Sequence, residues 1–420
     1  MTQNKYITIK TTADSKFKTA AVCLMLRRPL VRDEATKNSL LASVLGAGSM
    51  KYPNLYEINK YMEELYGAMF GSMVIKKGEF QIIRLYIEFP LTKDGNSELL
   101  VQAVTFLHEI LFNPLIINNE FSSEIFENEK NMLRDSIFER INDKNSYVRQ
   151  RCIEHMCTNE PFGIYADGYH EDLNALDSKA LYAHYKELIR TTPLEFIASG
   201  NIDCAAFEKL VLEKFSNYHY EPLSLNIGPI VYNPGPAAYH EEVLQVNQGK
   251  VCMGLRTGCD YKGRAFYTSL VLNEILGGSG NSKLFMNLRE KSSLCYSIFS
   301  FLYRAKSILM IQSGVESDNI EKAIEQINEQ IEIMKKGQIS DDELYLAKQG
   351  LVSGFKSITD SQGGVLEFNY SQHVLADDDC IEDIISGINA VSVADVVSLA
   401  AGLYTDTVYV LKGEKEVKDE

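Results

Sequence analysis

Hydrophobic and polar residues follow two different periods along the chain, and the same succession of periods occurs twice. In the first half, apolar runs at 18–28, 80–89 and 194–202 predict strands. Residues 36–47 predict a helix that runs into a Gly/Ser turn at Gly48–Ser49. Strands that bracket helical segments are typical of an α+β domain.

The second half repeats this order. A helix is again predicted before a glycine-rich turn, so that Leu276 corresponds to Leu45. The apolar runs that predict strands in this half are 249–258, 297–303, 307–316 and 407–415. We therefore predict two homologous α+β domains, each an antiparallel-rich sheet with helices packed on one face.

A linker is predicted between the halves. Residues 220–240, YEPLSLNIGPIVYNPGPAAYH, concentrate proline, glycine and asparagine. A chain of 420 residues is also longer than one ordinary hydrophobic core requires. The predicted organisation is a domain at 1–221, a linker at 222–240 and a domain at 241–420.

Long helices follow the first strands of each half. Residues 119–141 have apolar positions at three- and four-residue spacing. In the second half, Asp318 with Glu321 predicts a cap pair before a helix that Gly337 ends. Ser340–Glu343 predicts a capping box for the next helix.

The charge excludes several classes of partner. The chain has 57 acidic and 42 basic residues and a net charge of -15, which argues against nucleic acid or an anionic membrane as a partner. It has no 18-residue apolar run, and its start has no apolar signal segment. Eight cysteines without framework spacing are expected to be reduced thiols. We expect a cytoplasmic protein with no membrane contact.

Zinc ligands carried on a helix have a diagnostic spacing in sequence. Neither HExxH nor HxxEH occurs. Around His108, FLHEILF has Phe112 where a second histidine belongs, and around His184, AHYKEL has Leu188 at the last position. Both stretches fit amphipathic helices that pack an apolar face, and we favour that interpretation.

A second candidate for metal binding is the stretch RCIEHMC. It places Cys152, His155 and Cys157 within six residues. Cys157 is five residues after Cys152, which is awkward on one helix, and no companion CxxC supplies a fourth ligand. Buried thiols beside a helix-end histidine are the favoured interpretation.

The local pattern with the clearest chemistry is NSKLFMNLREKSSLCYS, which follows the glycine-rich stretch 277–283. Arg289 offers a rigid fork of donors, and Tyr296 offers a hydroxyl where strand character begins. Together they could hold a backbone carbonyl or carboxylate of an extended chain. An arginine paired with a surface glutamate and a half-buried tyrosine would explain the same residues. There is no GxSxG elbow and no phosphate-binding loop.

The segment LGGSGNSKLFMNLREKSSLCYS resembles the glycine-rich turn, arginine, six residues and tyrosine of the insulinase/pitrilysin zinc peptidases, the inverzincins. The resemblance is to their short two-domain form, shared by mitochondrial processing peptidase subunits and the core proteins of respiratory complex III. PFGIYADGYHEDLNAL at 161–176 resembles the segment after the family's long helix. The resemblance implies a processing-peptidase-like fold and a substrate-binding role for Gly277, Gly278, Arg289 and Tyr296.

The resemblance also implies that the metal site is degenerate. Active members carry HxxEH on the helix before a Gly-Ser/Thr turn. With that turn set on Gly48–Ser49, the two histidines fall on Ser39 and Ser43, and the general base falls on Ala42. Hydroxyls and a methyl group cannot hold zinc or activate its water.

The third zinc ligand of the family is a glutamate seven residues after another glutamate. Glu129 fits the earlier position, and Ser136 falls on the ligand. A shift of one to three residues would bring in Asp135 or Glu139, but neither replaces two histidines. The chain is therefore expected to hold no cofactor and to be inactive alone, although it belongs by resemblance to a metalloendopeptidase family.

By this resemblance the chain is the Arg/Tyr subunit of a heterodimeric peptidase, whose partner carries HxxEH and zinc and whose substrate is a peptide. Overall similarity is nearest to bacterial proteins associated with modification of elongation factor P. The alternative is an inert scaffold, as the complex III core proteins are. A hydrolase that uses Cys152, His155 and Cys157 ranks last. Homodimer formation without the partner is left open.

Overall fold

A computed structural model describes residues 6–91, 97–221 and 223–413. The chain forms two compact units, and each takes residues from both halves of the sequence. Unit 1 comprises residues 1–139, 164–226 and 359–374, and unit 2 comprises residues 140–163, 227–358 and 375–420.

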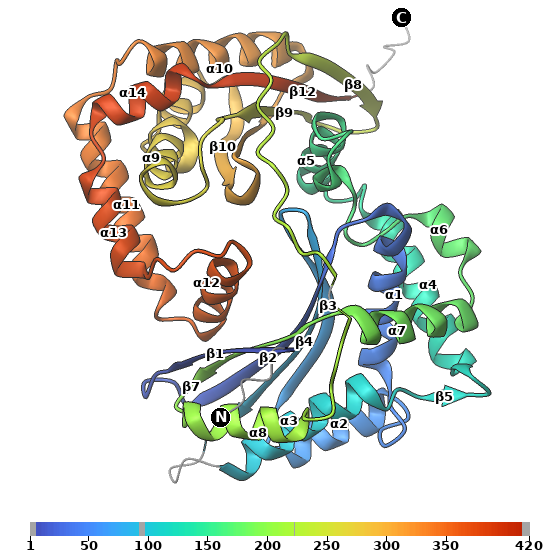
Figure 1. The fold of residues 1–420 in the computed structure, drawn as a ribbon. Helices are drawn as coiled ribbons and strands as arrows, with labels where there is room; N and C mark the ends of the chain where they lie inside the picture. The colour runs from blue at the N-terminus through green and yellow to red at the C-terminus, as the bar shows by residue number, and fades with distance from the viewer. Residues whose placement is uncertain (1–5, 92–96, 222, 414–420) are drawn as a thin grey trace, which may run out of the picture. The chain divides into compact units, whose positions relative to one another are not determined.

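The sheet of unit 1 has five strands in the order β1-β7-β2-β4-β3 (Figure 1). The strands β1 and β7 are parallel, and every other neighbouring pair is antiparallel. The bounds are β1 Ile7–Ala13, β2 Thr19–Pro29, β3 Met69–Lys77, β4 Phe80–Pro90 and β7 Leu194–Gly200, with a short hairpin of β5 Ile116–Ile117 and β6 Glu120–Phe121 beside them.

The sheet of unit 2 has the order β10-β11-β9-β12-β8. Here β8 and β12 are the parallel pair, and the other neighbours are antiparallel. The bounds are β8 Ala238–Leu244, β9 Gly249–Arg256, β10 Cys295–Tyr303, β11 Ile308–Val315 and β12 Tyr404–Gly413. Both sheets therefore place the first strand of the unit beside the last, which confirms the predicted pair of mostly antiparallel α+β folds.

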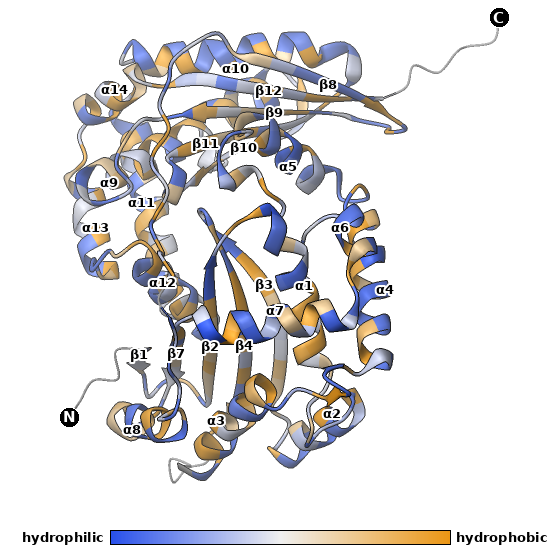
Figure 2. Cartoon of the chain, turned by 45° about the vertical axis from the view of Figure 1, so that its right-hand side comes forward, coloured by the Kyte–Doolittle hydropathy of each residue, from blue (hydrophilic) through white to orange (hydrophobic). Residues whose placement is uncertain are grey.

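Helices complete each unit. Unit 1 contains α1 Arg32–Ala47, α2 Leu55–Glu64, α3 Ser97–Phe112, α4 Ser123–Glu139, α6 His170–Ala175, α7 Ser178–Thr191, α8 Cys204–Lys214 and α12 Gln362–Val374. Unit 2 contains α5 Lys144–Met156, α9 Gly263–Asn273, α10 Ile320–Lys335, α11 Asp341–Ile358, α13 Ile381–Ala390 and α14 Val393–Ala401. Figure 2 shows hydrophobic and hydrophilic residues alternating around helices such as α4 and α10, as expected for helices that bury one face.

One helix of each unit comes from the other half of the sequence. In unit 1, α12 lies on the face of the sheet opposite α3 and α8, and in unit 2, α5 lies opposite α10 (Figure 1). Because successive strand residues point to opposite faces, β9 contacts α5 through Cys252 and Gly254. The units therefore differ from the contiguous ranges 1–221 and 241–420, and the second sheet face is covered by an element that the sequence did not predict there.

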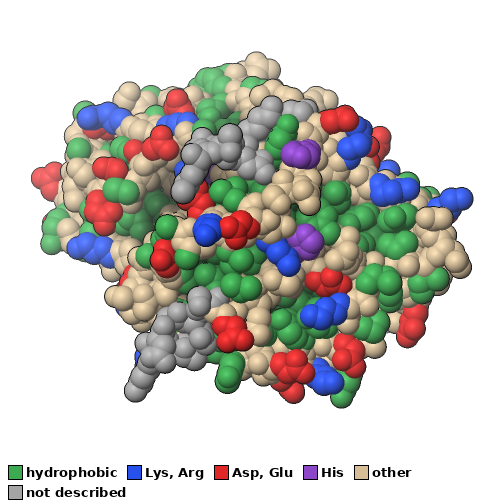
Figure 3. Space-filling view, turned by 60° about the horizontal axis from the view of Figure 1, so that its bottom comes forward, with side chains coloured by type: hydrophobic (Ala, Val, Ile, Leu, Met, Phe, Trp, Pro, Cys, Tyr) green, Lys and Arg blue, Asp and Glu red, His purple; other side chains and the backbone are tan. Residues whose placement is uncertain are grey.

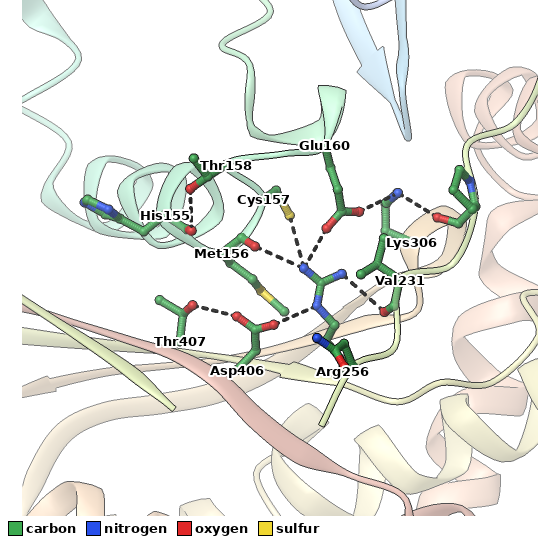
Figure 4. Close-up of polar contacts among 12 residues, drawn as sticks. His155, Met156, Cys157, Thr158, Glu160, Val231, Arg256, Lys306, Asp406 and Thr407 are labelled. Atoms are coloured by element: carbon green, nitrogen blue, oxygen red, sulfur yellow. Dashed lines mark hydrogen bonds and ion pairs between the residues drawn. The ribbon is translucent and has the colours of Figure 1, made fainter. Parts of the chain in front are cut away.

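Buried charges hold these two helices. In unit 2, Arg256 pairs with Glu160 at 2.6 Å and Asp406 at 2.8 Å, and Lys306 pairs with Glu160 at 2.7 Å (Figure 4). Glu160 follows α5 and so ties that helix to β9. Burial alone would raise the pKa of Glu160, but hydrogen bonds from Arg256 and Lys306 hold it below its usual range.

Unit 1 has a matching network. The carboxylate of Glu195 on β7 pairs with Arg27 on β2 at 2.6 Å. Two side chains of α12 reach the same carboxylate: the Tyr370 hydroxyl donates to it at 3.0 Å, and His373 lies 3.0 Å away. The stretches Val22–Arg27 and Val251–Arg256 align in the repeat, so Arg27 and Arg256 occupy corresponding places.

Three of the smaller predictions have different outcomes. The capping box of α11 is confirmed, because the Glu343 amide donates to Ser340 Oγ at 3.2 Å and the Ser340 amide donates to Glu343 Oε2 at 2.9 Å. The prediction of a helix cap at Asp318 is wrong. Asn319 is the residue that precedes α10, and its side chain makes no capping hydrogen bond. Gly337 does end α10, with a φ of 73°.

In the predicted linker, 222–240, residues 223–237 form no helix or strand, but residues 238–240 already belong to strand β8. The later part of the linker lies along unit 2, where the Tyr232 hydroxyl donates to the Gly402 carbonyl at 2.8 Å. Within the described ranges, no single helix is long and apolar enough to cross a membrane, and α13 with α14 meets that test only as a pair bent by 90°.

Candidate functional site

The glycine-rich turn packs a helix end tightly onto strand β10. Helix α9 continues into a π-helical turn, η2, Glu274–Gly278. A Cβ added at Gly277 would lie 2.6 Å from Ser300 Oγ and 2.9 Å from Leu284 Cδ1. Gly277 is therefore required for close packing, whereas Gly278 lies exposed at the end of the turn.

Arg289 lies on a second π-helical segment, η3, Phe285–Lys291. Leu288 is buried and anchors this segment, while the Arg289 side chain is 45% exposed. Among the described residues, the guanidinium contacts the ring of Phe285 at 4.7 Å and the carboxylate of Glu290 at 3.9 Å. Such loose contacts leave most of its donors available, and π-helical turns occur frequently at functional sites.

Tyr296 lies at an irregularity in strand β10. The register shifts between Cys295, which pairs with Val315, and Ser297, which pairs with Gly314. Tyr296 is thus the extra residue of a β-bulge, and its side chain is 60% exposed. Its hydroxyl donates to Glu316 Oε1 at 2.9 Å, and this hydrogen bond raises the pKa of Tyr296, which keeps the phenol protonated.

These four residues lie at one corner of unit 2. The turn at Gly277 contacts Ser300 on β10, and η3 leads directly into the same strand. Burial raises the pKa of the Cys295 thiol, while the nearby charge of Arg289 opposes that rise, so Arg289 lies within electrostatic range of the start of β10. Strand β10 is an edge strand, so its outer backbone groups have no partner strand in the sheet.

The degenerate motif lies on α1 inside the core of unit 1. Ala42 is 1% exposed and belongs to the hydrophobic core, Ser39 is buried and Ser43 is half-buried. The Ala42 carbonyl accepts a hydrogen bond from Ser72 Oγ at 2.6 Å, so α1 packs directly on β3. Two serines and an alanine supply no zinc donor set at this position.

The segment that follows the family's long helix also packs on α1. Gly168 has a φ of 81°, and a Cβ there would lie 2.4 Å from Thr36 Cα. Only glycine fits such a position without strain. The Tyr169 amide donates to Thr36 Oγ1 at 2.9 Å, which fixes this segment against the helix.

The position of the third ligand gives no better fit to zinc. Ser136 lies exposed on α4, and Glu129 on the same helix is half-buried, which raises its pKa. Within the described part of the chain, no group of three or more His, Cys, Asp or Glu side chains is arranged to hold a metal ion. The residues present therefore do not fit the family's zinc, and no reaction step is assigned to zinc in this chain.

His108 and His184, whose sequence contexts each lack one residue of a zinc-binding motif, take part in packing. His184 on α7 lies 2.7 Å from Asn38 Oδ1, and burial lowers the pKa of His184 to about 4. Asn38 in turn donates to Gln81 at 2.8 Å, so this histidine belongs to a polar network around α1. His108 on α3 contacts the ring of Phe112, with 4.9 Å between centroids.

The RCIEHMC cluster does not converge. Cys152 is buried, with its thiol 3.6 Å from the Cys252 carbonyl, and Cys157 is also buried. The ring of His155 points away from Cys157 (Figure 4) and stacks on His240 with 3.8 Å between centroids. The favoured interpretation of buried thiols beside a helix-end histidine agrees with this arrangement.

Sequence reasoning missed the buried ion pairs and the bulge. The repeated stretches VCLMLR and VCMGLR contain a signal for Arg27 and Arg256, because an arginine recurs at the same place after an apolar strand. Nothing in the sequence distinguishes Tyr296 as a bulged residue.

Several known proteins are similar to this chain in sequence. The family described as Peptidase M16 inactive domain matches residues 175–351. The probable inactive metalloprotease YmfF of Bacillus subtilis is 30% identical over 404 residues, which cover 95% of this chain and 94% of that protein. The uncharacterized zinc protease YmxG of the same organism is 23% identical over 299 residues, covering 70% of this chain and 71% of YmxG.

Solved structures share the fold. A conserved protein from Enterococcus faecalis superposes with a TM-score of 0.89 at 26% identity, covering 98% of this chain and 97% of that one. A protease from Helicobacter pylori has a TM-score of 0.78 at 16% identity, with 97% of each chain covered. This chain belongs to the peptidase M16 family of insulinase-type metalloproteases, and its sequence contains no HxxEH motif.

Proposed function

We propose that this chain is the substrate-binding subunit of a two-chain zinc peptidase, and that a second M16 chain with an intact HxxEH motif supplies the metal. In this proposal the zinc ion of the partner supplies a Lewis acid and an activated water. This chain supplies hydrogen-bond donors that orient the peptide.

The observation that carries the proposal is the exposure of two donors at one irregular corner of unit 2. The ion pair that Arg289 makes with Glu290 is long, with 3.9 Å between Nε and Oε1. Tyr296 projects from a bulge. A buried or tightly paired arginine would indicate a structural role, whereas an exposed fork of donors suits a ligand.

The chemistry follows from the donors that the two side chains offer. The guanidinium of Arg289 has N–H donors and no acceptor, and the raised pKa of Tyr296 keeps its hydroxyl a donor. A substrate carbonyl that accepts from Tyr296 would displace Glu316 from the hydroxyl. Both residues can then hold the peptide backbone in one orientation, which is the positioning contribution to catalysis.

The first test is reconstitution of cleavage with the HxxEH chain of the same organism. Arg289→Ala is expected to lower kcat/KM for a fluorogenic peptide by about tenfold to a hundredfold, the range for a lost hydrogen bond to a charged group. Lys291→Ala removes a neighbouring exposed cation on the same segment and is the matched control. Equal activity of both variants would contradict the proposed role of Arg289.

The second test concerns Tyr296. Tyr296→Phe removes only the hydroxyl and is expected to lower kcat/KM by up to about tenfold, as for one neutral hydrogen bond. Tyr345→Phe is a close control, because Tyr345 lies in the same unit and is 61% exposed against 60% for Tyr296. An unchanged rate for Tyr296→Phe together with a loss for Arg289→Ala would restrict the site to the arginine.

A scaffold role is the alternative. Complex III2 from Candida albicans contains a chain of this fold, with a TM-score of 0.72 at 13% identity, covering 97% of this chain and 93% of that one. Failure of every HxxEH chain of the organism to cleave peptides in mixtures with this protein would favour a scaffold and overturn the peptidase role.

A further inference from the structure

Unit 1 contains a cavity of about 360 Å³ at a place unrelated to the degenerate motif. It lies where the C-terminal ends of α3, α7 and α8 meet the residues that follow α8. A volume of this size falls at the small end of the range for ligand sites in proteins.

Aromatic rings form the apolar wall of this cavity. The His108 ring lies 5.1 Å from the Phe215 ring, and the Phe112 ring lies 5.8 Å from Phe215 and 5.7 Å from Tyr218. The Tyr218 hydroxyl is already engaged, because it donates to the Ile189 carbonyl at 2.8 Å. Phe215 and Tyr218 are buried, whereas His108 and Phe112 are half-buried, so the wall presents mainly the rings of these last two residues.

The rim of the cavity is cationic, with Lys186, Arg190 and Lys214 among the lining residues. Arg190 is neutralised by ion pairs with Glu187 and Glu221. Within residues 6–91, 97–221 and 223–413, neither lysine has an ion pair with a carboxylate.

The two lysines make this rim locally positive in a chain whose net charge is -15, and Lys186 Nζ also lies 4.7 Å from the centre of the Tyr182 ring. Burial lowers the pKa of His108, and the charge of Lys214 lowers it further, which places that cation near the aromatic wall. Figure 3 shows the face that carries α3 and α8, where basic and histidine side chains lie among hydrophobic ones.

We propose that this cavity binds a small aromatic carboxylate, with the ring against His108 and Phe112 and the carboxylate between Lys186 and Lys214. An aromatic ring gains edge-to-face contacts with this wall, and the carboxylate gains two cations that have no other carboxylate partner. The ligand is either a free acid or the C-terminal aromatic residue of a peptide, which present the same chemistry. The site is independent of the proposed peptidase role.

The absence of tryptophan from the chain makes the test direct. Indole-3-acetate is added to the full-length protein, and the change in indole fluorescence is followed without a tryptophan background. Saturable binding is expected, and the neutral analogue indole-3-ethanol should bind about tenfold more weakly, as expected for the loss of contacts with two exposed cations. A short peptide that ends in tryptophan, with a free or an amidated C-terminus, distinguishes a peptide end from a free acid.

Charge-matched variants locate the binding. Lys186→Gln with Lys214→Gln removes both rim cations and is expected to abolish the preference for the acid over the alcohol. Lys179→Gln with Lys209→Gln removes two exposed lysines from the same helices, α7 and α8, outside the cavity, and should leave that preference unchanged. Equal affinity of the wild-type protein for acid and alcohol, or an equal loss in the control, would overturn the proposal.

Discussion

His184 illustrates how burial decides the role of a single residue. Its sequence context, AHYKEL, is one residue short of a metal-binding motif, yet the ring lies between α7 and α1 and contacts Asn38 at 2.7 Å. Desolvation disfavours the imidazolium, and this lowers the pKa of His184 from 6.5 to about 4. The residue therefore acts in the core as a neutral hydrogen-bonding group.

This shift predicts a pH-dependent stability. Between pH 6.5 and about 4 the unfolded chain binds a proton at His184 that the folded chain does not. The free energy of unfolding should therefore fall as the pH is lowered through this window, by about 3 kcal/mol from this group. In His184→Gln the decrease over the same window should be smaller, as measured by urea unfolding at a series of pH values.

A control for the loss of a histidine is His219→Gln, at an exposed residue of the same unit. If His184→Gln and wild type lost the same stability between pH 6.5 and 4, a buried neutral His184 would be disproved.

Arg289 and Tyr296 show a second effect at this scale. Sequence spacing identified both residues, but their presentation depends on a π-helical segment and a β-bulge. Irregular backbone of this kind turns a side chain outward that a regular helix or strand would place elsewhere. The exposure of the two donors is thus a property of the folded backbone.

At the scale of elements, the exchange of α5 and α12 between sequence halves is the main feature. Each of these helices covers a sheet face that would otherwise expose strand side chains such as Cys252. Each is also tied by a buried carboxylate, Glu160 in unit 2 and Glu195 in unit 1. Hydrophobic contact gives the area of the interface, and the ion pairs fix the position of the helix on it.

Removal of one such carboxylate should be strongly destabilising. Glu160→Gln removes the carboxylate that Arg256, 3% exposed, and Lys306, 1% exposed, share, while Arg256 keeps its ion pair with Asp406. Removing one partner of a buried ion-pair network is expected to reduce the free energy of unfolding by about 3–5 kcal/mol. The measurement is the midpoint of urea unfolding, with the slope of the transition unchanged.

Glu332→Gln provides the comparison for this change. It breaks an exposed pair with Lys335 in the same unit and should reduce stability by less than about 1 kcal/mol. Similar effects of the two substitutions would mean that the Glu160 network does not hold α5.

At the scale of the whole molecule, two units of the same topology differ in what they retain. Unit 1 carries the motif position on α1 with serine and alanine in place of ligands, and unit 2 keeps the arginine and the tyrosine. The isolated chain is therefore expected to contain no stoichiometric zinc and to cleave no peptide. Metal analysis should find no zinc in the purified protein alone. In the complex reconstituted with the HxxEH chain it should find one zinc ion per complex.

One zinc per isolated chain would contradict this expectation. Two zinc ions per complex would show that this chain contributes a metal site of its own. A complex with one zinc and no cleavage would instead separate assembly from catalysis and favour the scaffold alternative.

The sequence by itself determined the repeated α+β design, seven of the ten strands in the two five-stranded sheets, the family and the absence of an HxxEH motif. The strands β1, β3 and β8 were not predicted. The features that were predicted follow from local periodicity and from residue identity, which the linear pattern contains. Only the tertiary structure decided that α5 and α12 each join the unit formed mainly by the other half of the sequence. It also decided that Glu195 lies buried beside Arg27, and that Arg256 lies buried beside Asp406. Finally, it placed two lysines and several aromatic rings around one cavity. Such groupings join residues that are far apart in the chain, and chain folding rather than sequence spacing brings them together.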